Sequence, residues 1–177
     1  ESIRNFADRI GVAKRENVID VSLLEHCVRD DLNKHAPRVM AVLKPIEVEI
    51  TNYPDGQEET LKAIINPENK ELGHREIPFS KHIYIDQDDF MEDPPKGYRR
   101  LYPGAEVRLK YAYFIKCNEV IKDDQGKVVK LKCSYDIETK SGSGFKGRKP
   151  NGTIHWVPKE QSIPVEVRLY DRLFKNE

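Results

Sequence analysis

The sequence predicts a mainly β protein, an antiparallel β-barrel preceded by a short α-helical segment. Apolar residues recur at helical spacing only within the first 36 of the 177 positions. From position 38 onward, apolar and polar residues alternate, and turns containing glycine or proline separate the alternating runs. Strands that are separated by turns, without helical periods between them, indicate an antiparallel barrel or sandwich.

Two helices are expected at the start of the chain. The apolar residues of Ile3–Ile10 recur at helical spacing, and Gly11 is placed to end the first helix. A second helix is predicted to start at Ser22, because Ser22-Leu-Leu-Glu25 has the pattern of a capping box. Pro37 is expected to end this helix by forcing the preceding residue out of the helical region. The predicted domain boundary therefore lies at Pro37, with residues 1–37 helical and residues 38–177 forming the barrel.

Barrel strands are expected where side chains alternate between a buried and a solvated face. A hairpin turn is expected at Asp123–Gly126, between two long strands. The Gly-, Ser- and Lys-rich stretch Ser141–Gly152 is expected to be a mobile loop, and the acidic stretch Asp86–Asp93 a short helix or loop. The predicted strands are Arg38–Leu43, Ile46–Ile50, Glu59–Ile65, His82–Ile85, Ala105–Asn118, Lys127–Tyr135, Gly152–Val157 and Ile163–Leu173.

The composition limits the classes of function. Thirty basic and thirty acidic residues cancel, so any attraction to a polyanion has to come from a local patch. Cys27, Cys117 and Cys133 form no CxxC pair and no zinc-like spacing with a histidine, so no metal site is expected. This sparse cysteine count fits a reducing, cytoplasmic location. No apolar run is long enough to span a membrane, so a membrane partner is not expected.

Motifs for catalysis are missing from the sequence. It contains no GxSxG, HExxH, P-loop or GxGxxG pattern. His155 lies in a strand-like pattern with no nucleophile beside it, so a packed or hydrogen-bonded role is expected there. The chain begins at Glu1 and stops directly after an apolar run, which suggests a piece excised from a longer protein.

The stretch Lys96–Lys116 concentrates positive charge. It holds six basic residues and one acid, Glu106, with four tyrosines and Phe114 interleaved. Cations neutralise phosphates, and aromatic or guanidinium planes stack on unpaired bases. The stretch therefore predicts two strand edges that offer basic groups to a single-stranded nucleic acid. The alternative is a hairpin with a solvated basic face.

Ordered motifs along the whole chain closely resemble glutaminyl-tRNA synthetase. The strongest is the helix–barrel junction Asp30–Val42, and several ordered motifs together are far more specific than any one of them. The other matching stretches are Ile3–Val12, Asn52-Tyr53, Ile77–Ser80, Tyr98–Leu101, Glu106–Leu109, Gly152–Val157 and Pro164–Phe174.

This resemblance implies a particular piece of that enzyme. Residues 1–37 would be the end of the helical connecting subdomain, and residues 38–177 most of the proximal anticodon-binding β-barrel. The catalytic domain and the distal barrel would lie outside this chain. The HIGH- and KMSKS-like ATP signatures are absent, so the chain is expected to need no cofactor and to be inactive alone, while the parent enzyme uses ATP. The implied partner is the anticodon loop of glutamine tRNA, not DNA, and the implied parent enzyme is a monomer.

The resemblance also implies site residues. Arg38 matches the arginine that contacts the middle anticodon base, and Arg108 with Lys110 matches the basic residues at the first base. The remaining matches lie in the turn before them: Lys96, Tyr98, Arg99 and Arg100, of which the two arginines face the third base. Two positions depart from the family pattern: Gly97 stands where a glutamine is expected, and Lys110 where an arginine is expected. The second change replaces a bidentate fork with a point charge.

Three alternatives remain open. A glutamyl-tRNA synthetase of the archaeal or eukaryotic type shares this barrel architecture. A protein-interaction barrel could use the same basic stretch to dock an acidic partner. For Arg38 the structural alternative is an ion pair at the helix–barrel junction, and for Tyr98 it is simple packing. A free-standing enzyme is opposed by the missing catalytic motifs.

Overall fold

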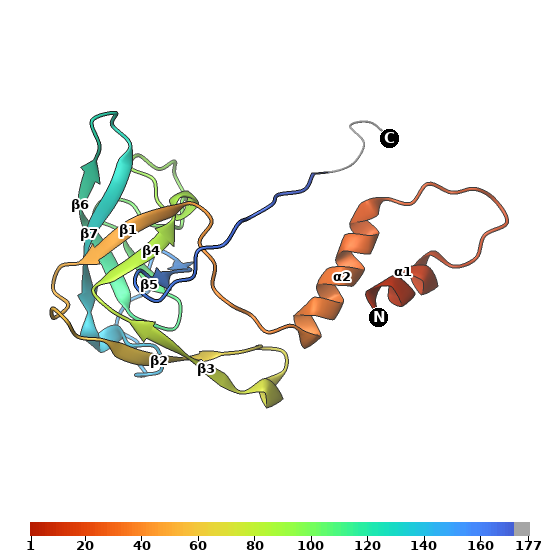
Figure 1. The fold of residues 1–177 in the computed structure, drawn as a ribbon, viewed down its shortest axis with the longest axis horizontal. Coiled ribbons are helices and arrows are strands. Elements are labelled where there is room, and N and C mark those ends of the chain that lie inside the picture. Colours follow the sequence, from red (N-terminus) through yellow and green to blue (C-terminus); the bar gives the residue numbers. More distant parts are fainter. Residues whose placement is uncertain (172–177) are drawn as a thin grey trace. The chain divides into compact units, whose positions relative to one another are not determined.

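The computed structural model describes residues 1–171 and divides into two compact units (Figure 1). A helical unit comprises residues 1–39 together with residues 62–76. A β unit comprises residues 40–61 and the chain from residue 77 onward. No helix among the described residues is long and apolar enough to cross a bilayer.

The helical unit is built on α1 (Ser2–Ile10) and α2 (Val21–His35). Ser2 joins the two helices, because its backbone N–H and its hydroxyl both donate to Oδ2 of Asp31, at 3.2 and 2.9 Å. Gly11 ends α1 with a φ of 64°, and its N–H donates to the carbonyl of Ala7. Ala36 leaves the helical region ahead of Pro37, with φ −81° and ψ 137°. Both predicted helix ends are confirmed.

The predicted start of α2 is wrong by one residue. The helix begins at Val21, and its N-cap is Asp20, whose Oδ1 accepts from the N–H of Ser22 at 2.8 Å. Ser22 therefore donates its backbone N–H to the N-cap residue and is not the N-cap itself. An aspartate suits this position because its carboxylate accepts the free N–H groups and its charge favours the positive end of the helix.

A seven-stranded sheet forms the β unit, with strand order β8-β5-β6-β7-β1-β4-β9. A separate two-stranded sheet pairs β2 with β3. The strands are β1 (Pro45–Ile50), β2 (Glu59–Ile64), β3 (His74–Phe79), β4 (His82–Asp86), β5 (Glu106–Leu109), β6 (Phe114–Lys122), β7 (Val128–Asp136), β8 (Thr153–Ile154) and β9 (Val157–Pro158). Three 3-10 turns are described, at Lys70–Leu72, Gln87–Asp89 and Ile137–Thr139.

Most neighbours in the large sheet run antiparallel, as predicted. β6 and β7 form the long hairpin through Asp123–Gly126, and β1 pairs antiparallel with β4. Two ladders are parallel: β1 with β7, and β5 with β8. The parallel ladders join segments that lie far apart in the chain, which local turn signals cannot reveal.

One short segment links the two edges of the sheet. β8 pairs with β5 at one edge and β9 pairs with β4 at the other, and only His155 and Trp156 separate them. The sheet must therefore curl until its edges are within reach of two residues. This confirms the predicted mainly β, barrel-like fold.

Trp156 occupies the core at this closure. Its side chain is fully buried, and its ring meets Phe79 edge-to-face with centroids 5.2 Å apart. Its indole N–H donates to the carbonyl of Lys110 at 2.9 Å. Such a partner matters because an unpaired buried N–H costs about 1–3 kcal/mol. Trp156 thus fixes the turn between β5 and β6 as well as the closure.

Several predicted strands are interrupted or missing. Residues 38–44 form no strand, because the N–H groups of Leu43 and Lys44 donate to the carboxylate of Asp86 instead of a neighbouring strand. The predicted strand 105–118 breaks between β5 and β6, where Tyr111 has a φ of 66°. The predicted strand 152–157 splits into β8 and β9, because its two ends pair with opposite edges.

The last predicted strand, 163–173, is also wrong as far as the structure describes it. Residues 163–171 form no ladder, and residues 172 and 173 lie outside the described residues. An alternating pattern makes a strand only where a second strand supplies hydrogen bonds, and no described strand pairs with this stretch. Its apolar residues are consequently exposed.

Glu47 centres an ion-pair network on the outer face of β1. Its carboxylate lies 2.7 Å from Nζ of Lys159 and 3.4 Å from Nζ of Lys130, and Lys130 lies 2.7 Å from the carboxylate of Glu49. Partial burial alone would raise the pKa of Glu47. The hydrogen bond from Lys159 and the charge of Lys130 outweigh burial and leave this pKa below its usual value.

We expect Trp156→Ala to destabilise the fold by roughly 3–5 kcal/mol, the usual cost of truncating a large buried aromatic residue. Urea unfolding followed by far-UV circular dichroism measures this, since Trp156 is the one tryptophan of the chain and the variant has no indole fluorescence. Val165→Ala, at a position 74% exposed, is the large-to-small control. Equal losses in the two variants would contradict the closure argument.

We expect Glu47→Gln to remove a contribution that depends on pH. Because the folded-state pKa of Glu47 is lowered, its contribution is present above its unfolded value of 4.5 and is lost as the pH falls through the folded pKa. The free energy of unfolding should therefore differ between wild type and variant at pH 7, and the two should converge well below pH 4.5. A difference that stayed constant across this range would rule out the carboxylate charge as its cause.

Candidate nucleic-acid interface

Arg108 projects from β5 beside the loop that follows β7. Its neighbours Val107 and Leu109 point into the core, so the strand alternation turns Arg108 outward. Its guanidinium carbon lies 4.3 Å from the centroid of the Phe114 ring. Nη1 donates to the carbonyl of Thr139 and to Oγ of Ser141, both at 3.1 Å. These contacts hold the guanidinium plane against the sheet.

No carboxylate pairs with Arg108 within the described part of the chain. Partial burial lowers the pKa of this guanidinium, and no negative charge compensates. A guanidinium remains charged even so, because its ordinary pKa is far above neutrality. Arg108 therefore presents a partly desolvated positive charge that its own fold leaves unneutralised.

Lys110 lies two residues further, in the turn between β5 and β6. Its Nζ is 3.4 Å from Nε2 of His155 and 5.5 Å from the ring centroid of Tyr111. Partial burial, and then the charge of Lys110, lower the pKa of His155. A neutral His155 ring can accept from the ammonium group. The prediction of a hydrogen-bonded His155 is confirmed, and its position beside Lys110 adds a polar group to this surface.

Arg100 is paired, in contrast to Arg108. Its Nε donates to Oδ1 of Asp89 at 2.7 Å, and its Nη1 donates to the carbonyl of Arg99 at 3.2 Å. Burial raises the pKa of Asp89, although the hydrogen bond from Arg100 opposes this. Together the two side chains offer both donors and acceptors at one place.

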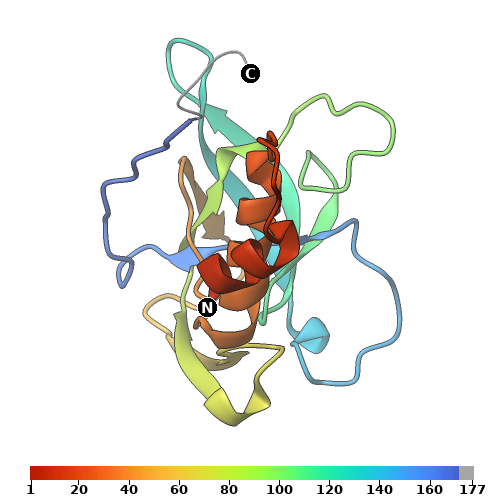
Figure 2. The ribbon, with the colours of Figure 1, turned by 90° about the vertical axis from the view of Figure 1, so that its right-hand side faces the viewer.

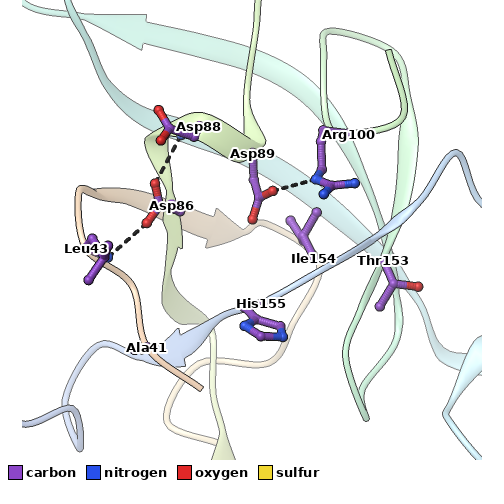
Figure 3. Close-up of a pocket in the computed structure, with 9 residues that line it drawn as sticks. All are labelled: Ala41, Leu43, Asp86, Asp88, Asp89, Arg100, Thr153, Ile154 and His155. Carbon is purple, nitrogen blue, oxygen red and sulfur yellow. Dashed lines mark hydrogen bonds and ion pairs between the residues drawn. The ribbon is translucent and has the colours of Figure 1, made fainter. Parts of the chain in front are cut away.

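The Asp89–Arg100 pair lines a cavity of about 460 Å³ (Figure 3). Figure 3 shows His155 on the far side of this cavity from Asp86 and Asp88. Asp86 itself is occupied, since its two oxygens accept from the backbone N–H groups of Leu43 and Asp88. The lining is Ala41, Leu43, Asp86, Asp88, Asp89, Arg100, Thr153, Ile154 and His155.

The turn before Arg100 carries the other predicted residues. Tyr98 is half-buried, its hydroxyl lies 3.4 Å from the carbonyl of Asp88, and burial raises its pKa. Lys96 and Arg99 are exposed. Gly97 has a φ of 92°, in a turn closed by the N–H of Tyr98 and the carbonyl of Pro95. That backbone conformation favours glycine, which accounts for glycine at this position.

Gly152 brings this turn onto the closing segment. A Cβ at position 152 would lie 2.1 Å from the carbonyl oxygen of Arg99, so only glycine fits. The carbonyl of Gly152 accepts from the N–H of Arg108 at 2.8 Å. Asn151 adds two bonds to the same turn, to the carbonyls of Tyr98 and Arg100 at 3.2 and 2.7 Å. The β unit thus brings together Lys96, Tyr98, Arg99, Arg100, Arg108 and Lys110 on neighbouring segments.

Arg38 belongs to the helical unit. Its Nη2 lies 3.0 Å from the carboxylate of Glu68 and 3.3 Å from both the carbonyl and the side-chain oxygen of Asn33. Asn66 fixes the same corner by donating to the carbonyls of Asn33 and Ala36, at 2.9 and 3.1 Å. The ion pair expected for Arg38 if its role is structural is therefore present, with Glu68 as the partner. The side chain of Arg38 nevertheless remains 40% exposed.

Sequence reasoning missed the residues that surround Arg108. Thr139 and Ser141 accept from its guanidinium, and Phe145 and Arg148, in the following loop, contact the ring of Phe114 on which that guanidinium lies. The basic and aromatic residues of that loop were a usable signal. Its glycines were interpreted only as a sign of mobility.

The chain matches two family models. Residues 36–136 match the model described as tRNA synthetases class I (E and Q), anti-codon binding domain, and residues 153–177 match a second model with the same description. Proteins named glutamine–tRNA ligase are similar over nearly the whole chain. The identity is 56% for the one from Clostridium perfringens, 54% for Pseudomonas putida and 53% for Bradyrhizobium diazoefficiens.

These alignments cover 98–99% of this chain and 30–31% of each relative, so the chain spans about a third of the length of the curated relatives it matches. The first family model alone covers more than half of the chain. The chain therefore belongs to the family of anticodon-binding domains of class I (E and Q) tRNA synthetases.

Proposed function

We propose that this chain reads the anticodon loop of glutamine tRNA as part of a glutamine–tRNA ligase. The whole enzyme would attach glutamine to its tRNA with ATP. Two lines support the choice of glutamine over glutamate: the relatives above carry the name glutamine–tRNA ligase, and they are more than half identical to this chain. A cytoplasmic location and a monomeric parent enzyme belong to the same proposal.

The observation that carries the proposal is the unneutralised charge of Arg108. A guanidinium held over the ring of Phe114, without an acidic partner among the described residues, is ready to donate to an external acceptor. Nucleobase carbonyls and ring nitrogens are such acceptors, and arginine suits them because its donors form a rigid fork. An unpaired anticodon base offers these edges free of a complementary strand.

The neighbouring residues take roles that follow from their contacts. Arg100 and Asp89 provide a donor and an acceptor in one cavity, which suits the Watson–Crick edge of a base. Lys110 is a point charge in the turn between β5 and β6. The exposed Lys96 and Arg99 suit phosphate groups. Tyr98 and Arg38 complete the proposed anticodon-binding set, Arg38 through the exposed part of its side chain.

In this proposal, the activation of glutamine with ATP takes place in the rest of the parent enzyme. The sequence holds no ATP-binding signature, so this chain is proposed to bind tRNA without a cofactor and without activating glutamine. Absence of ATP–pyrophosphate exchange by the purified chain is the expected result. Exchange above background would contradict this part of the proposal.

A titration with RNA tests the function directly. The purified chain is titrated with the glutamine anticodon stem-loop and with the same stem-loop carrying a changed middle base, at two salt concentrations. Preferential binding of the cognate loop at both concentrations is expected. Equal affinity for both loops, with a steep salt dependence, would mean phosphate attraction without base reading.

We expect Arg108→Ala to weaken binding of the cognate stem-loop about 5- to 150-fold, because a good base contact contributes about 1–3 kcal/mol. It should also reduce discrimination at one anticodon position. Lys127→Ala is the matched control, because it also removes one positive charge from an exposed position. Lys127 follows the hairpin turn between β6 and β7, whereas Arg108 lies beside Phe114 at the other end of β6. Equal effects of the two substitutions would show that only net charge matters.

A further inference from the structure

A second cavity, of about 490 Å³, lies between β5 and the loop that follows β7. It is lined by Arg108, Lys140, Ser141, Gly142, Gly144 and Phe145. Figure 2 shows this loop, in light blue, standing away from the sheet. The cavity therefore places an aromatic ring and the unneutralised guanidinium of Arg108 at the same opening.

The ring of Phe145 is held in place from several sides. It meets Phe114 edge-to-face, with centroids 5.9 Å apart and planes at 83°. Gly147 leaves room for it, since a Cβ there would come within 2.8 Å of the ring's Cζ. The guanidinium carbon of Arg148 lies 5.4 Å from the ring centroid. An exposed loop thus carries an aromatic ring whose position is set before any ligand arrives.

Arg148 is a fixed neighbour for Phe145. Its Nε and Nη2 donate to the carboxylate of Glu106, both at 2.6 Å, and Nη2 also lies 2.7 Å from Oδ2 of Asp136. Those two carboxylates neutralise its charge. Arg148 is therefore part of the support of the ring, and the charge available at this cavity is that of Arg108.

Lys140, the other cation at the opening, is occupied as well. It is ion-paired with Glu59. The cavity consequently offers one guanidinium that no described carboxylate neutralises and one aromatic ring, not a cluster of unpaired cations. Phosphate would use the guanidinium and gain nothing from the ring, whereas a nucleobase has both a π-face and acceptor atoms on its edge.

We propose that Phe145 is a stacking residue for one unpaired anticodon base, which presents its acceptor edge to Arg108. The inference rests on the proposed function and adds a base-positioning residue that lies outside the basic stretch. Stacking by Phe145 would position the base, and Arg108 would read its edge. The loop after β7 then serves as part of the reading surface.

The test uses three stem-loops, each with 2-aminopurine at one anticodon position, because the fluorescence of this base responds to stacking. Wild type should change the fluorescence at one position. Phe145→Leu, which keeps an apolar side chain, should abolish that change and weaken binding roughly 5- to 150-fold, the range for one base–aromatic stack. Phe145→Trp should restore both signals. Tyr84→Leu is the control, at a half-buried aromatic that lines neither cavity.

The outcomes separate the two proposals. If wild type binds the stem-loop and Phe145→Leu keeps both affinity and fluorescence change, Phe145 does not stack. If Phe145→Leu and Phe145→Trp lose affinity alike, the ring only supports the loop, and stacking is again overturned. If wild type binds neither these stem-loops nor the unmodified cognate stem-loop, the proposed function itself fails.

Discussion

The closure of the sheet by a six-residue segment is the constraint on which the rest of the β unit depends. β8 and β9 lie at opposite ends of the strand order, yet two residues join them. Burying Trp156 at this crossing makes the closure stable, because a large aromatic side chain contributes more apolar area than any other core residue. Its indole N–H also ties down the turn that carries Lys110. The proposed binding surface thus lies on the segment that closes the sheet.

The electrostatic organisation of the surface follows from which cations are neutralised internally. Arg38, Arg100 and Arg148 each have a carboxylate partner, at 3.0, 2.7 and 2.6 Å. Arg108 has burial and a ring under it but no such partner among the described residues. A chain with no net charge can therefore still present a focused positive site. In the proposed interface the neutralised arginines would act through shape and hydrogen bonding, and Arg108 would add an unneutralised charge to the hydrogen bonds that it donates.

Local signals made much of this fold predictable, and long-range pairing set the limit. The C-terminal end of the first helix and the hairpin at Asp123–Gly126 depend on neighbouring residues, so their sequence patterns were sufficient. The split of residues 152–157 depends on two edges that are distant in the chain, and no periodicity encodes that. The prediction of a strand over residues 163–171 is wrong although the local pattern is present, because no described strand pairs with this stretch. For the site, charge density pointed to the basic stretch, but the supporting contacts from Thr139, Ser141 and Phe145 arise only through folding.

Gly152 makes the two cavities parts of one mechanical unit. Its Cα rests against the carbonyl of Arg99, next to the Asp89–Arg100 pair, while its carbonyl holds the N–H of Arg108. We expect a displacement at either cavity to affect the other through this contact, because no side chain at position 152 lies between the two backbone segments. We therefore expect the energetic effects of substitutions in the two cavities not to add, because sites joined by shared contacts couple, whereas sites more than about 7–10 Å apart with no shared partner usually behave independently. If each cavity binds one anticodon base, substitutions that change the base preference of one cavity would have to be selected together with substitutions in the other.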